Sequence, residues 1–191
     1  MGLILGITGT PGTGKKTLAP KVAKALGMPV FSINNLLSPL ERSSAAKGVD
    51  PLTLRRRLMR RNPGRCVVFG HLVPDVLQKR DIERVVVLRC DPSVLRRRLS
   101  LRGYSSAKVA GNVEAELIGV VSASCYGRFG PKKVVEFDAT RASIAESARK
   151  VERLLTSRTP RKAPLDWVPA YSSAEKLRSL LSVARTESAF T

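Results

Sequence analysis

The sequence predicts an α/β fold in which helices flank a five-stranded parallel sheet. A glycine-rich loop lies between an apolar run and a helical segment, short apolar runs alternate with helical segments along the chain, and most of these runs are apolar throughout. Strands that are covered on both faces have this continuous apolar character, and the alternation is typical of parallel sheets. The expected strands are residues 3–8, 30–33, 66–69, 85–88 and 134–137.

The segments between these strands have the spacing and the end signals of helices. Asp91 is followed by Pro92, which is a typical helix start with an N-cap and a proline in the first turn. Ser143 and Glu146 form a capping box at the start of another helix. Because parallel α/β sheets bind ligands beyond the carboxyl ends of their strands, we expect the site there. The expected helices are residues 15–26, 51–61, 73–79, 91–101, 105–125 and 143–155.

The glycine-rich loop, residues 9–17 with the sequence GTPGTGKKT, predicts a phosphate-binding site. Glycines let backbone N–H groups turn toward a phosphate, and the helix that follows adds its positive N-terminal dipole. Gly12, Thr13 and Gly14 would surround the phosphates, Lys15 would reach the terminal ones and Thr17 would touch the α-phosphate. A plain glycine-rich turn is the alternative, but spacing and context both favour the phosphate site.

One position departs from the phosphate-loop pattern. The pattern places Ser or Thr directly after the lysine, where the hydroxyl ligates Mg²⁺. Lys16 occupies this position, and Thr17 offers a hydroxyl one residue later, on a different side of the helix. The sequence therefore predicts a triphosphate site whose usual metal ligand is missing.

The chain carries a formal net charge of +19 over 191 residues, which is extreme for a metabolic enzyme of this size. Such a charge predicts an anionic partner larger than a nucleotide, most plausibly RNA. Aromatic residues make up only 5% of the chain, so we expect phosphate contacts rather than base stacking. Arginines at 55–57 and 60–61 would meet phosphates or lie on a solvated helix face, and a generally basic surface is the alternative for the whole chain.

The cysteine content and the apolar runs indicate a soluble, cytoplasmic protein. The three cysteines lack the spacing of metal ligands, and Cys66 and Cys90 lie in or beside apolar strands, as small core residues do. No apolar run approaches the length of about 18 residues that a membrane span needs, so we expect no membrane partner.

The last third of the chain predicts an appendage. Residues 157–171 are polar and basic and contain prolines, which predicts a linker. Residues 172–191 are expected to form an amphipathic helix and a tail, with a capping box from Ser172 to Glu175. This helix would pack on the main domain, with a partner protein as the alternative.

Several landmarks occur together in the order and spacing of one known family. They are the loop at 9–15, Gly70-His71 after the third strand, the segment 87–91, Arg102-Gly103-Tyr104 followed by Lys108, Asn112 and Glu116, and the segment 135–140. In these landmarks the chain resembles the small atypical adenylate kinases of archaea and eukaryotic nuclei. The resemblance covers residues 1–156 and implies a nucleoside monophosphate kinase fold with two mobile covers.

The resemblance also implies places for the substrates. The segment that binds the acceptor nucleotide would be residues 32–49, and the donor lid residues 101–111. Arg102 would be the lid arginine on the phosphates of ATP, and Asp138, Ala139 and Thr140 would lie near its adenine. His71 would lie beside the transferred phosphate and position water for hydrolysis; a plain loop histidine is the alternative. Lys108, Asn112 and Glu116 share one helix face and would latch the lid or lie in solvent.

Phe69 marks a second departure, because members of this family usually carry an acid two residues before the histidine. Together with Lys16, it removes both usual protein anchors for Mg²⁺, although the family implies Mg²⁺ use and no site residue is assigned to the metal. Two hypotheses follow: Lys16 supplies part of the missing charge, or Asp75 and Asp91 hold a hydrated Mg²⁺ through waters.

Two functions follow from the sequence. The first is an ATP-dependent adenylate kinase, or broad-specificity nucleoside monophosphate kinase, with Lys15, His71 and Arg102 as catalytic residues, AMP or a related monophosphate as acceptor, and ATPase activity. The resemblance implies a role in late maturation of the small ribosomal subunit, with a ribosomal protein and rRNA as partners. The alternative is a catalytically weakened, nucleotide-gated assembly factor that binds ribosomal protein and RNA.

Overall fold

The computed structural model describes residues 4–38, 41, 49–61, 64–157 and 164–182. A five-stranded sheet with the order β2-β3-β1-β4-β5 forms its centre, and every neighbouring pair is parallel. The predicted α/β fold is therefore confirmed. The strands are β1 (Ile4–Thr8), β2 (Val30–Ser32), β3 (Cys66–Phe69), β4 (Ile82–Arg89) and β5 (Val134–Asp138).

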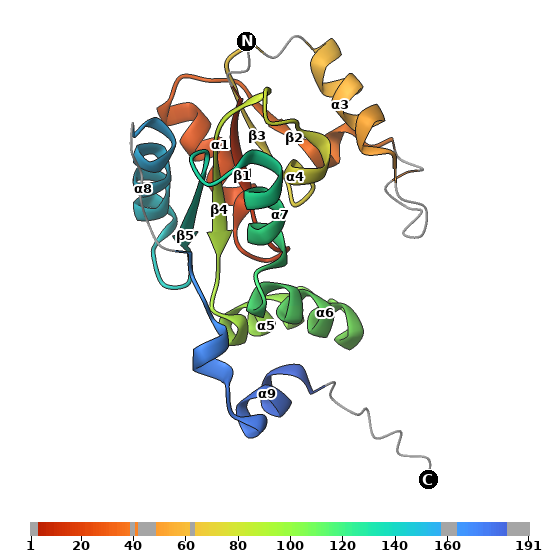
Figure 1. Cartoon of the computed structure of the whole chain (residues 1–191), viewed down its shortest axis with the longest axis vertical. Helices are drawn as coiled ribbons and strands as arrows, with labels where there is room; N and C mark the ends of the chain where they lie inside the picture. Colours follow the sequence, from red (N-terminus) through yellow and green to blue (C-terminus); the bar gives the residue numbers. More distant parts are fainter. Residues whose placement is uncertain (1–3, 39–40, 42–48, 62–63, 158–163, 183–191) are drawn as a thin grey trace.

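Helices cover both faces of the sheet, and a further group lies beyond its carboxyl end (Figure 1). One apolar core packs α1 and α8 against the sheet, and a second packs α3, α4 and α7 against the opposite face. A third, smaller core joins α5, α6 and α9. The helices are α1 (Lys15–Ala25), η1 (Ile33–Leu36), α3 (Pro51–Arg60), α4 (Val73–Val76), α5 (Pro92–Ser100), α6 (Ser106–Leu117), α7 (Val120–Phe129), α8 (Ile144–Thr156), η2 (Val168–Tyr171) and α9 (Ala174–Leu181).

The structure refines two of the expected helical segments. Residues 105–125 are mostly helical, as expected, but they belong to two helices, because Gly119 between them adopts a left-handed backbone with φ of 71°. The helix expected at 73–79 ends at Val76, because the Asp81 carboxylate accepts a hydrogen bond of 2.9 Å from the N–H of Gln78 and holds the chain in a turn. β4 is also longer than the expected 85–88, since it begins at Ile82.

The C-terminal helix packs on the main domain, as predicted. Leu180 of α9 is buried in the small core with Leu95 and Leu99 of α5. Arg96 of α5 donates hydrogen bonds to the carbonyl oxygens of Leu180, at 3.0 Å, and Ser182, at 2.8 Å. These bonds satisfy carbonyl groups that the end of a helix leaves without partners.

The start of this helix differs from the expectation. Ser173, rather than Ser172, is the N-cap, and its hydroxyl accepts a hydrogen bond from the N–H of Lys176. The tail beyond 182 lies outside the described residues, as do residues 39–40 and 42–48 of the acceptor segment expected at 32–49 and residues 158–163 of the linker.

The cysteines are core residues with free, buried thiols. Burial raises the pKa of Cys66 to about 11, that of Cys90 to about 11 and that of Cys125 to about 12. Within the described ranges, no helix combines the length and the apolar character that a membrane span needs.

Candidate functional site

The phosphate loop begins directly at the end of β1 and leads into α1. Thr10 and Thr13 fix its turn, because the Thr13 N–H and hydroxyl both donate to the Thr10 carbonyl oxygen, at 3.2 and 3.0 Å. Gly14 precedes α1 in a left-handed conformation, and no side chain in the described part of the chain caps this helix start. The free N–H groups of the first turn and the helix dipole therefore remain available to an anion.

Gly9 has no room for a side chain. Its φ is 138°, and an added Cβ would lie 2.2 Å from the carbonyl oxygen of Leu88 and 3.0 Å from the Thr13 hydroxyl. We expect Gly9→Ala to lower the free energy of unfolding by about 2 kcal/mol more than Gly14→Ala, measured by urea denaturation. Gly14 is the matched control, because its φ is 100° but no atom lies within 4 Å of an added Cβ. Equal losses in the two variants would show that backbone strain alone sets the cost.

Lys15, the first residue of α1, folds back over the loop. Its ammonium donates hydrogen bonds to the carbonyl oxygens of Gly9, at 2.6 Å, and Thr10, at 2.9 Å. Burial lowers the pKa of Lys15 to about 8, the Glu116 carboxylate opposes this shift, and the Arg102 guanidinium adds to it. The protonation of Lys15 in the loop therefore depends on two charged side chains from other segments, Glu116 and Arg102.

One pocket of about 260 Å³ joins the phosphate loop to two distant segments. The turn after α5 brings Arg102 to it, and the turn after β5 brings Ala139. Arg98, Ala142 and Ser147 also line it, although the sequence did not single them out. Six of the expected nucleotide-binding residues therefore surround one space: Gly12, Thr13, Gly14, Thr17, Arg102 and Ala139.

Other expected site residues lie elsewhere. Asp138 and Thr140 line an adjacent hollow with Asp91 and Trp167, rather than the pocket of the phosphate loop. The Thr140 N–H donates to the Asp138 carboxylate at 2.9 Å, and the Asp91 N–H donates to the Thr140 hydroxyl at 2.8 Å. These two residues therefore hold the turn after β5 to the start of α5. Lys16 is exposed at the start of α1.

His71 follows β3, is half-buried and lies within electrostatic reach of Lys15. Burial lowers the pKa of His71, the Lys15 ammonium lowers it further, and Asp75 opposes the shift. A histidine with a lowered pKa is neutral at pH 7 and accepts a hydrogen bond through one ring nitrogen.

The residues present do not fit a Mg²⁺ ion bound directly by protein. Lys16 and Phe69 occupy the two usual ligand positions. The Asp91 carboxylate is engaged as the N-cap of α5 and also accepts a hydrogen bond of 2.8 Å from the Tyr171 hydroxyl, while Asp75 lines a different hollow, beside α3 and α7. Among the residues that the structure describes, no group of three or more His, Cys, Asp and Glu side chains is placed to hold a metal.

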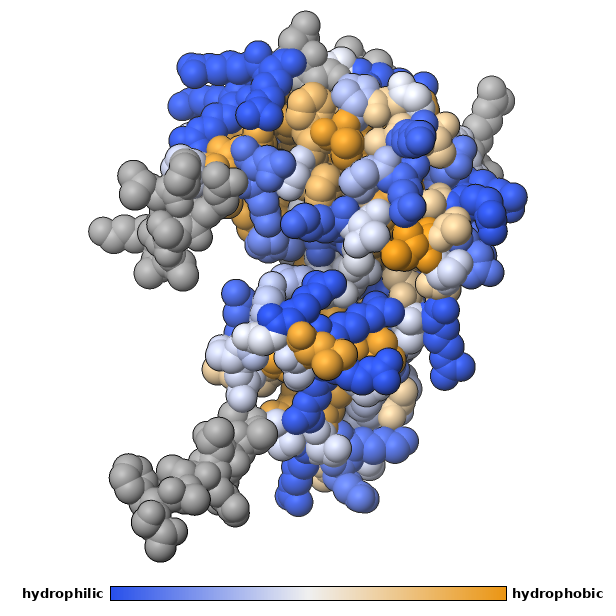
Figure 2. All heavy atoms as spheres, turned by 180° about the vertical axis from the view of Figure 1, so that it is seen from behind, coloured by the Kyte–Doolittle hydropathy of each residue, from blue (hydrophilic) through white to orange (hydrophobic). Residues whose placement is uncertain are grey.

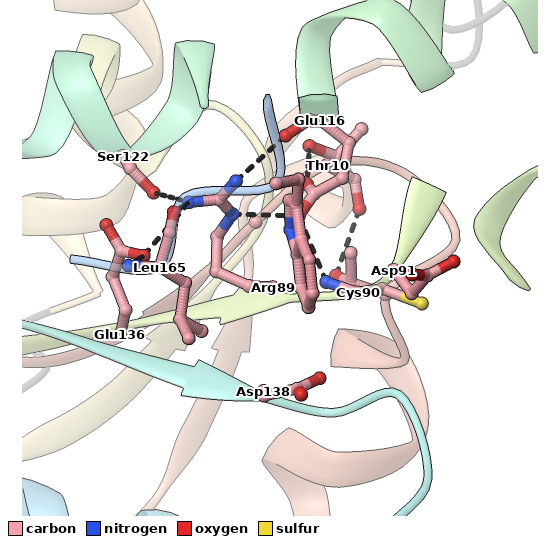
Figure 3. A network of polar contacts seen from close by, with 12 residues as sticks. Thr10, Arg89, Cys90, Asp91, Glu116, Ser122, Glu136, Asp138 and Leu165 are labelled. Atoms are coloured by element: carbon pink, nitrogen blue, oxygen red, sulfur yellow. Dashed lines mark hydrogen bonds and ion pairs between the residues drawn. The ribbon is translucent and has the colours of Figure 1, made fainter. Parts of the chain in front are cut away.

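Lys108, Asn112 and Glu116 all lie on α6, as expected, but Glu116 does not lie in solvent. It is only 1% exposed, whereas Lys108 is exposed and Asn112 is half-buried. The Glu116 carboxylate accepts hydrogen bonds from the Thr10 hydroxyl at 2.5 Å and from Arg89 Nε at 2.8 Å (Figure 3). Glu116 therefore contacts the phosphate loop itself. The helical spacing did indicate the helix, but an isolated acid in a helix gives no sign that it is buried.

Several arginines have partners within the protein. Arg98 donates to the carbonyl oxygen of Thr140 at 2.9 Å, Arg55 forms a two-bond pair with Asp81 at 2.7 and 2.8 Å, and Arg57 pairs with Glu41 at 2.6 Å. On α3, only part of the arginine run is therefore available to phosphates.

A family model described as an AAA domain matches residues 5–119, which is more than half of the chain. The chain belongs to that family. A curated protein from Thermococcus onnurineus (strain NA1), named "Putative adenylate kinase", is 33% identical over 174 residues, and the match covers 88% of this chain and 93% of that protein. The match to a protein named as a nucleotide kinase thus extends over 88% of this member of the AAA domain family.

Solved structures of other P-loop kinases share the fold. A gluconokinase from Sinorhizobium meliloti 1021 superposes with a TM-score of 0.58 and 21% identity, covering 81% of this chain and 91% of its own. A shikimate kinase from Bacteroides thetaiotaomicron gives a TM-score of 0.52 and 20% identity, covering 80% and 98%. At this identity the likeness concerns the fold of this chain and leaves its acceptor open.

Proposed function

We propose that the chain is an adenylate kinase, an ATP-dependent nucleoside monophosphate kinase, with slow ATPase activity. The observation that carries the proposal is the pocket of about 260 Å³ in which the phosphate loop meets Arg102 and Ala139. The similarity to curated proteins named adenylate kinase supports AMP as the acceptor.

In the proposed reaction, the γ-phosphoryl group of ATP passes to a phosphate oxygen of AMP. The bond between the γ-phosphorus and the β–γ bridging oxygen breaks, the new P–O bond forms on AMP, and both products are ADP. Gly12, Thr13 and Gly14 surround the phosphates, Thr17 contacts the α-phosphate, and Lys15 exchanges its two carbonyl partners for phosphate oxygens. Arg102 closes over the donor and adds charge where it develops in the transition state.

His71 is the candidate for the ATPase activity. As a neutral histidine near Lys15, it would orient a water for attack on the γ-phosphorus when no acceptor is bound. The adenine is proposed to lie near Ala139, and the neighbouring Asp138 and Thr140 hold the turn that carries Ala139.

The experiment that tests this proposal is conversion of ATP and AMP to ADP by the purified protein, with Mg²⁺ and with EDTA. Turnover that requires Mg²⁺ would establish the kinase and would contradict replacement of the metal by Lys16. Turnover that survives EDTA in the wild type and is lost in Lys16→Ala would establish that replacement. ATP binding without any ADP formation would overturn the kinase proposal.

The affinity for ATP is expected to fall as the pH rises above about 8, because Lys15 then loses its proton. Bound phosphate favours the charged ammonium, so the pKa of Lys15 is higher in the complex than in the free protein. Binding is therefore at full strength below the free-state pKa and weakens above it, by at most about tenfold per pH unit for one proton. Titration calorimetry at pH 7, 8 and 9 would check this, with Lys15→Met, which carries no charge, as the pH-independent control.

The second candidate, a nucleotide-gated ribosome assembly factor in the cytoplasm, is favoured by the charge of +19. Arg56, Arg60 and Arg61 are exposed on and after α3, and Figure 2 shows long hydrophilic side chains gathered over this helix. Such a surface fits the phosphates of rRNA and an acidic face of a ribosomal protein. This candidate predicts RNA binding that weakens steeply with salt and changes with ATP, and Arg56→Ala should reduce the salt slope by about one.

A further inference from the structure

A buried polar network lies at the carboxyl end of β4, between the phosphate loop and the C-terminal segment (Figure 3). Arg89 and Glu136 are each 2% exposed, and Glu116 is 1% exposed. Arg89 donates to the Glu116 carboxylate at 2.8 Å, to the Glu136 carboxylate at 2.9 Å and to the Glu116 carbonyl oxygen at 2.8 Å. With these bonds, one guanidinium fixes both the side chain and the backbone of Glu116.

The network reaches the phosphate loop through one hydrogen bond. The Thr10 hydroxyl donates to Glu116 at 2.5 Å, and Thr10 itself is 2% exposed. The Thr10 carbonyl oxygen accepts from the Lys15 ammonium and from Thr13. Glu116 therefore holds the residue on which the lysine and the turn of the loop both depend.

Glu116 also acts on the charge of the loop. Its carboxylate opposes the burial that lowers the pKa of Lys15, whereas Arg102, after α5, adds to the lowering. His71, after β3, also lies near this lysine. Of the two charged side chains in the described residues that shift the pKa of Lys15, Glu116 is the carboxylate, so its charge favours the protonated lysine.

The C-terminal segment completes the support of Glu116. The Leu165 N–H donates to Glu136 at 2.8 Å, and its carbonyl oxygen accepts from Arg89 at 2.8 Å. The Trp167 indole N–H donates to Glu116 at 3.3 Å. Residues 165–167 lie in the expected linker, but Leu165 and Trp167 are part of the same buried network.

We propose that Glu116 is a positioning residue for the phosphate loop, acting through the Thr10 hydroxyl, and that Trp167 of the C-terminal segment helps to hold it. The inference rests on the proposed use of the loop for ATP. A charge-assisted hydrogen bond between buried groups is short and directional, so it fixes the loop backbone in one place. Fixing the loop before ATP arrives lowers the cost of ordering it on binding.

The test compares Thr10→Val, Thr10→Ser and Glu116→Gln with the wild type. Valine has nearly the shape of threonine but lacks the hydroxyl, and serine keeps the hydroxyl. We expect Thr10→Val and Glu116→Gln each to raise KM for ATP about tenfold while KM for AMP changes less than twofold. Thr10→Ser should recover most of the loss, and the double variant Thr10→Val/Glu116→Gln should be no worse than the poorer single variant.

A purely structural role would give a different pattern. It would lower Tm in these variants without a selective change in KM for ATP, and that result would overturn the inference. Glu114→Gln is the matched control, because Glu114 lies on the same helix and is exposed. Glu116→Gln should also move the alkaline loss of ATP affinity to lower pH, and an unmoved pH profile would contradict the electrostatic part.

Trp167 supplies a second readout that does not need turnover. It is the only tryptophan in the chain, so its fluorescence reports on its own surroundings. ATP titrated into the wild type should change this emission, and Thr10→Val should reduce the change, since it breaks the connection to the loop. If the wild type binds ATP without turnover, the kinase proposal alone is overturned. If all variants bind ATP with equal affinity and show the same change in tryptophan emission, the positioning role of Glu116 alone is overturned.

Discussion

Lys15→Ala is expected to lower kcat/KM for ATP by about two to three orders of magnitude in the ADP-forming assay. The lysine is the cation inside the phosphate loop, and a methyl group in its place leaves the developing charge on the terminal phosphates without that partner. We do not expect the neighbouring Lys16 to replace it, because the Lys15 ammonium lies against the carbonyl oxygens of the loop, whereas Lys16 is exposed at the start of α1.

Two controls separate the charge of Lys15 from the stability of the loop. Lys21→Ala removes an exposed lysine from the same helix and should leave kcat/KM unchanged within twofold. The Tm of Lys15→Ala should fall by only a few degrees, because the cost of burying the ammonium offsets much of its hydrogen bonding to Gly9 and Thr10. Activity of Lys15→Ala within tenfold of the wild type would contradict the role of this lysine.

Most of the fold could be predicted because the strands other than the edge strand β2 are largely buried. Such strands are largely apolar, and the five expected ones are present in the described structure with nearly the expected limits, except at the start of β4. The start of β4 was missed because Glu83 and Arg84 interrupt the apolar pattern at the partly exposed end of the strand. The break at Gly119 was missed because a glycine within a helical pattern is compatible both with continuation and with an end.

The candidate site could be predicted where a motif is local in the sequence. The phosphate loop and Arg102 were identified, and the structure brings both to one pocket. The partners of Glu116 could not be predicted, because Thr10, Arg89 and Trp167 lie far apart in the chain and meet only when β1, β4 and the C-terminal segment pack together. The positive charge of the sequence was a poor guide to individual side chains. Arginines that were expected to contact phosphates or solvent instead bind carbonyl groups and carboxylates of the protein.

Arg89→Ala is expected to lower the free energy of unfolding by about 3–5 kcal/mol, measured by urea denaturation. Arg89 is the cation between two buried carboxylates, those of Glu116 and Glu136. Without it, both charges would remain in an environment that excludes water, and the carbonyl oxygens of Glu116 and Leu165 would lose a donor. We expect the loss of stability to arise mainly from leaving the two carboxylates and the carbonyl oxygens buried without a partner, rather than from losing the attraction between Arg89 and the carboxylates.

That distinction can be measured. Arg65→Ala breaks a comparable pair with Glu83, but the two side chains are 51% and 37% exposed, so the loss should be below about 1 kcal/mol. The triple variant Arg89→Met/Glu116→Gln/Glu136→Gln removes the charges together and should be more stable than Arg89→Ala, because no buried charge is left alone. A triple variant no more stable than Arg89→Ala would show instead that the two unpaired carboxylates are not the source of the cost.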